Sequence, residues 1–142
     1  MVREEVFQEI LEYINDELET QGLNPYGATI LPYIPSYEQA RFPLIVMSQV
    51  EYALNQEALN KREKKHAIGL ELNVFAIDTA TVNKRTIANS VADLVESIIQ
   101  DTYGLKLESS ETIPNLQENV YRIVMRFTGL VDDDTKIIYR EI

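Results

Sequence analysis

The chain has 142 residues, of which 45% are hydrophobic and 25% charged, a composition typical of one folded domain over residues 1–142 rather than of a disordered or repetitive chain. Its 13 basic and 23 acidic residues give a formal net charge of −10, which argues against direct nucleic-acid readout because that affinity comes from Lys and Arg neutralising phosphates. The absence of cysteine excludes disulfides, thiolate metal sites and cysteine nucleophiles.

The first residues, MVREEVFQEILEYI, are too acidic for a secretory signal, which needs a basic start and an unbroken apolar stretch. The longest uncharged apolar run is PLIVM at 43–47, far short of the ~20 residues that cross a bilayer. We therefore expect a cytoplasmic product without a membrane partner.

Residues 2–20 predict the clearest helix. Acidic side chains fill most of its other faces, and Gly22 and Pro25 are placed to end it. Its apolar side chains recur at a spacing of four, as one buried helix face requires: they are Val2, Val6, Ile10, Ile14 and Leu18.

Residues 24–43 are rich in proline and tyrosine, which excludes a long helix or a central strand. The segment predicts a short edge strand around 28–33 followed by an extended connection. Its tyrosines either contact a partner or fold back over the core, and the sequence leaves both interpretations open.

Two β-branched, apolar stretches at 43–53 and 66–78 predict a hairpin of long strands with a polar tip at about 55–64. In the second stretch the residues alternate between two faces. One face holds Ile68, Leu70, Leu72 and Val74; the other holds Gly69, Glu71 and Asn73.

Residues 81–101 predict a second helix with a broad apolar face, capped by Asp78 and Thr79 or Thr81 and ended at Tyr103 and Gly104. The segment 105–117 is weakly patterned. Strict alternation then returns at 119–131, and IIYREI closes with a short strand. One face of 119–131 holds Tyr121, Ile123, Met125, Phe127 and Val131; the other holds Val120, Arg122, Val124, Arg126 and Thr128.

This order of elements predicts an α+β fold, a mostly antiparallel β-sheet with two helices packed on one face. No repeat of 20–50 residues and no linker divides the chain.

The sequence offers little for catalysis or cofactor binding. His66 is the single histidine, follows a basic run and has no nucleophile motif to support it. Asp132, Asp133 and Asp134 lack the ligand spacing of a calcium loop, and the five glycines never cluster as a phosphate-binding loop requires. Glu71 and Glu51 are a possible carboxylate pair across the hairpin, as any acidic chain offers. We expect no catalytic, cofactor or metal site.

Two surfaces are candidates for interaction instead. Arg122 and Arg126 alternate with valines on one strand face, which long arginine stems can cover or another subunit can contact. The basic run near the hairpin tip is the other, either a solvated loop or a docking site for an acidic neighbour. It contains Lys61, Arg62, Lys64 and Lys65.

If this basic tip docks on an acidic surface of a neighbouring protein or of the next subunit, reversing its four cations to Glu should barely change the melting temperature. The same change should impair the assembly in which the chain takes part, and added salt should weaken docking of the wild type. Normal assembly by the reversed variant would show that the loop is only solvated.

The chain resembles the tail terminator, or tail-completion, proteins of long-tailed bacteriophages and phage-tail-like particles. The resemblance is carried by FPLIVMSQVEY (42–52), KKHAIGLELNVFAID (64–78), IANSVADLVESII (87–99), GLKL (104–107) and NVYRIVMRFTGLVDDDTKIIYR (119–140). It covers about two-thirds of the chain and is one of order and texture, without an invariant catalytic motif.

The resemblance implies a hexameric ring of small subunits that caps the head-proximal end of the tail tube in the virion. Its implied partners are other copies of the chain, the tail tube protein, the head–tail connector and, in contractile particles, the sheath protein. Two other classes stay open: a different connector component such as a stopper or adaptor, and a stand-alone enzyme or ligand-binding domain with a concave apolar pocket. Neighbouring genes for tail tube, sheath or tape measure would distinguish them.

Overall fold

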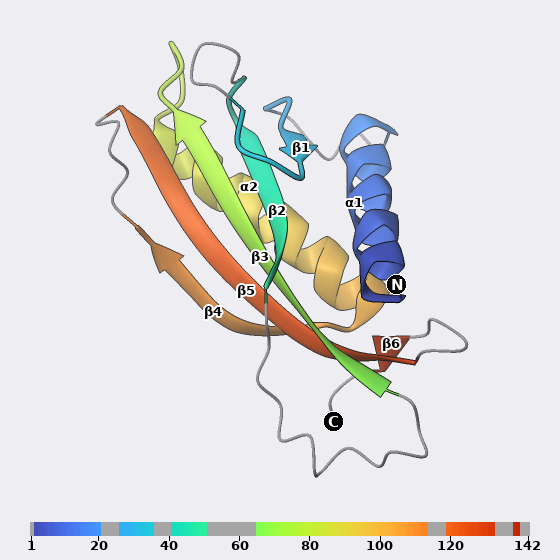
Figure 1. Ribbon diagram of the computed structural model, residues 1–142. Helices are drawn as coiled ribbons and strands as arrows, with labels where there is room; N and C mark the ends of the chain where they lie inside the picture. The colour runs from blue at the N-terminus through green and yellow to red at the C-terminus, as the bar shows by residue number, and fades with distance from the viewer. Residues whose placement is uncertain are drawn as a thin grey trace.

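The computed structural model describes residues 2–20, 26–35, 41–50, 65–113, 119–132 and 138–139. A helix and two strands come first: α1 (Val2–Thr20), β1 (Thr29–Leu31) and β2 (Leu44–Val50). The long strand β3 (Lys65–Ile77) leads to α2 (Lys84–Ile98), which continues into a π-helical turn (Ile99–Tyr103). The strands β4 (Lys106–Thr112), β5 (Val120–Asp132) and β6 (Ile138–Tyr139) complete the described chain (Figure 1).

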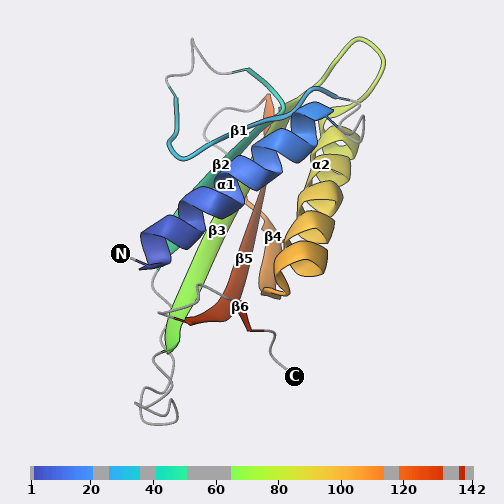
Figure 2. The same cartoon turned by 90° about the vertical axis from the view of Figure 1, so that its right-hand side faces the viewer.

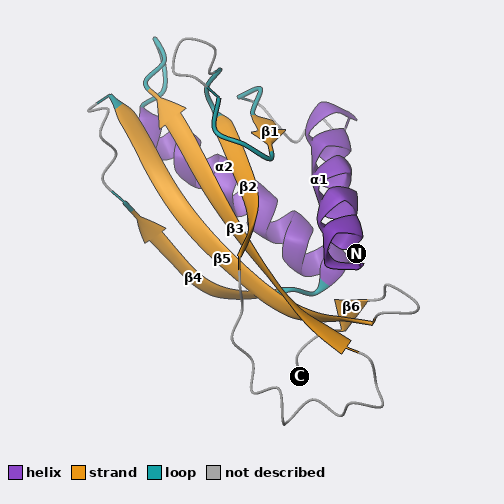
Figure 3. Ribbon diagram, in the orientation of Figure 1, coloured by secondary structure: helices purple, strands orange, loops and turns teal. Residues whose placement is uncertain are grey.

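The strands form one sheet in the order β1-β2-β3-β5-β4, with β6 pairing with β5 (Figure 3). β1 runs parallel to β2, and the other paired strands are antiparallel. The longest ladder joins β3 and β5, from Lys65 opposite Asp132 to Ile77 opposite Val120. The predicted α+β class with a mostly antiparallel sheet is confirmed.

Both helices lie on the same face of the sheet (Figure 2). α1 contacts β1, whereas α2 contacts β3 and β5. One hydrophobic core fills the space between this layer and the sheet. It includes the buried strand residues that point toward the helices, which are Ile30, Ile45, Met47, Ile68, Leu70, Leu72, Val74, Ala76, Ile123, Met125 and Phe127.

The predicted core face of α1 is confirmed. Val6, Ile10, Ile14 and Leu18 are buried, each no more than 5% exposed. Their spacing of four brings them onto one side of the helix, where their burial against the sheet offsets the low helix propensity of β-branched residues. The expected stop at Gly22 and Pro25 lies outside the described residues.

The start of α2 differs from the prediction. Its N-cap is Asn83, whose Oδ1 accepts a hydrogen bond from the Thr86 N–H at 2.9 Å. Asp78 and Thr79 instead order the preceding turn, because Asp78 Oδ1 accepts from the Lys84 N–H and Thr79 Oγ1 from the Val82 N–H. The caps predicted at Asp78, Thr79 or Thr81 are therefore wrong, although two of these side chains do bind backbone N–H groups close to the helix start.

The other end of this helix follows the prediction at Gly104. The residue has a left-handed backbone with φ of 67°, and its N–H donates to the Gln100 carbonyl. Glycine adopts this conformation without the steric cost that a Cβ imposes.

The weakly patterned segment after Gly104 contains a strand that the sequence did not predict. β4 lies at the edge of the sheet beside β5, most of its side chains are exposed, and its register shifts between Leu107 and Ser109. An exposed edge strand needs no apolar alternation, so its sequence carries little periodicity.

The described helices do not combine the length and apolarity needed to cross a membrane.

Candidate functional site

The face of the sheet opposite the helices, here called the outer face, is the strongest candidate for interaction. Figure 1 is viewed from this side, and no described helix covers it. The alternation in β3 and β5 places polar and apolar side chains here in two groups, and the predicted division of both strands into faces is confirmed through Thr128.

The first group, here called the apolar patch, lies across the end of the sheet where β1, β2, β3 and β5 meet. Leu44, Val46, Phe75 and Val120 form its buried centre, each no more than 9% exposed. Three partly buried side chains pack against this centre, namely Leu31, Phe42 and Ile77.

Arg122 adjoins this patch and is held in place by two neighbours on β3. Its Nε donates a hydrogen bond of 2.8 Å to Asn73 Oδ1, and its guanidinium lies over the Phe75 ring, 5.5 Å from the centroid. Phe75 is directly opposite Arg122 in the ladder, so the antiparallel register brings the cation and the ring together. Asn73 is neutral, and within the described residues the ion pairs of the outer face do not include Arg122.

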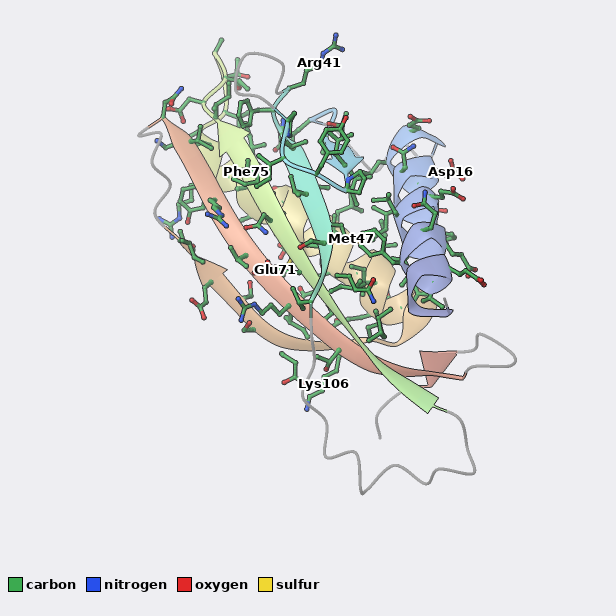
Figure 4. The ribbon with its side chains drawn as sticks, in the orientation of Figure 1. Asp16, Arg41, Met47, Glu71, Phe75 and Lys106 are labelled. Carbon is green, nitrogen blue, oxygen red and sulfur yellow. The ribbon has the colours of Figure 1, made fainter. Side chains whose placement is uncertain are left out.

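Arg126 follows Arg122 by four residues on the same face of β5 and pairs with Glu71. Its Nη2 and Nε lie 3.2 and 3.3 Å from Oε1 of Glu71, again across the β3–β5 ladder. Figure 4 labels Glu71 on β3. The Arg126 side chain is 60% exposed, so solvent screens this ion pair and its contribution to stability is below about 1 kcal/mol. Arg126 therefore stays accessible to a partner, while its hydrogen bonds to Glu71 set its orientation.

The third polar contact reaches the edge strand. Thr128 Oγ1 donates to Glu108 Oε1 at 2.8 Å, and Lys106 Nζ lies 3.8 Å from the same oxygen. The outer face thus passes from the apolar patch to a row of ordered polar side chains.

The structure brings together some of the predicted candidates and leaves others aside. Arg122 and Arg126 share the outer face, as the alternation predicted, and Arg122 adjoins the apolar patch. The basic residues Lys61, Arg62 and Lys64 lie outside the described residues, as does Glu51. Lys65 is the first residue of β3, with its Cα opposite that of Asp132, and nothing further is described of its side chain.

Sequence reasoning missed the partners of the two arginines. Asn73 and Phe75 become neighbours of Arg122 only through the register of β3 against β5. The available signal was the spacing of these residues from Glu71. Asn73 and Phe75 follow Glu71 by two and four residues, and residues two apart on a strand occupy one face.

A pair of aromatic side chains joins α1 to the π-helical turn. The rings of Tyr13 and Tyr103 meet edge to face, with centroids 5.7 Å apart. Burial raises the pKa of the Tyr103 phenol, and the Glu9 carboxylate and Tyr13 add to the effect. Burial disfavours the charged phenolate, so this site holds Tyr103 neutral.

This raised pKa predicts a loss of stability at alkaline pH. In the unfolded chain Tyr103 ionises near pH 10, whereas in the folded chain it keeps its proton to higher pH. Above about pH 10 the folded state binds more protons, so the free energy of unfolding falls as pH rises. Urea melts between pH 8 and 11 should show a shallower decline for Tyr103→Phe than for the wild type. Equal declines would contradict the assignment.

Within the described residues, no cluster of three or more His, Asp or Glu side chains is arranged to hold a metal ion. No protein-family model matches the chain, and a search of curated proteins gave no significant match.

Proposed function

We propose that the chain is a structural subunit of a phage or phage-like tail. In this proposal, copies assembled in the host cytoplasm form a ring at the head-proximal end of the tail tube. The ring ends tube polymerisation and offers an attachment surface to the head connector and, in contractile particles, to the sheath.

The observation that carries the proposal is the construction of the outer face. An apolar patch whose buried centre includes Phe75 lies beside Arg122, and Asn73, Phe75 and Glu71 set the orientation of the two arginines. Aromatic and arginine side chains are enriched at the centres of protein interfaces, and preorganised side chains lose less entropy on binding. This surface suits contact with another protein subunit.

The resemblance to tail terminator proteins, in the order and texture of the segments, is the second support for this proposal. The segments that carry it include β2, β3, α2 and β5, which are the elements that build the sheet and one of its covering helices. Subunits that contact one another head to tail close into a ring when the rotation between them permits, and six copies is the number that the resemblance implies.

Removing the chain from its particle tests the proposal. Without the ring, tubes should grow to irregular lengths and fail to join heads, and supplying the wild-type chain should restore both. Tubes of normal length without heads would assign the chain to another connector component, such as a stopper or adaptor. Normal, head-bearing tails would reject a role in the tail.

A further inference from the structure

We draw no further inference here: the strongest candidate, the exposed apolar pair Tyr33 and Ile34 that follows the edge strand β1, carries no proposal because nothing in the described part of the chain shows what covers it.

Discussion

Replacing Ile10 by alanine should lower the free energy of unfolding by about 2–5 kcal/mol. Ile10 is fully buried in the core between α1 and the sheet, and the truncation removes apolar contacts and leaves a cavity that the packed neighbours fill only in part. Urea denaturation of the purified chain, followed by circular dichroism, measures the loss.

The adjacent residue provides the matched control. Glu9 is exposed on the solvent side of α1, and Glu9→Ala should change the free energy of unfolding by less than roughly 0.5 kcal/mol. The two substitutions alter neighbouring positions of one helix. A difference between their free energies of unfolding therefore shows which face of the helix is buried, and not how stable the helix is as a whole. Similar losses from both would refute the packing of α1 described here.

A second pair of neighbours should separate folding from assembly. Phe127 is fully buried beneath the helices, and Phe127→Ala should cost about 3–5 kcal/mol. Arg126 points to the outer face, and among the described residues its side chain makes only an exposed ion pair, so Arg126→Ala should cost less than about 1 kcal/mol.

In assembly, we expect a defect from Arg126→Ala even though the variant melts like the wild type. Measuring melting and tail formation for both variants gives the comparison. An Arg126→Ala chain that assembles normally would remove Arg126 from the proposed subunit contact, and one that unfolds as readily as Phe127→Ala would contradict its exposed position.

Periodicity explains why the faces of the main elements could be predicted. The spacing of four in α1 and the alternation in β3 and β5 each record which side chains meet the core, because burial selects apolar residues at one position per period. The position of Arg122 and Arg126 on the face opposite the helices follows from the same alternation.

The features that sequence reasoning missed depend on contacts between distant segments or on exposed backbone. β4 has one neighbouring strand and side chains such as Ser110 and Glu111 in solvent, so nothing in its pattern distinguishes it from a loop. The parallel pairing of β1 with β2 depends on how segments far apart in the sequence align in the sheet. The same is true of the contacts of Arg122 with Asn73 and Phe75. At the start of α2, several polar residues were able to cap the helix, and local sequence did not distinguish Asn83 from Asp78.

Electron microscopy of intact particles, with the chain labelled, decides whether it forms the proposed ring. We expect a closed ring of six copies at the head-proximal end of the tail tube, between the tube and the connector. Another copy number at that position would reject the hexamer. Label elsewhere in the particle, or none at all, would contradict the tail-terminator function.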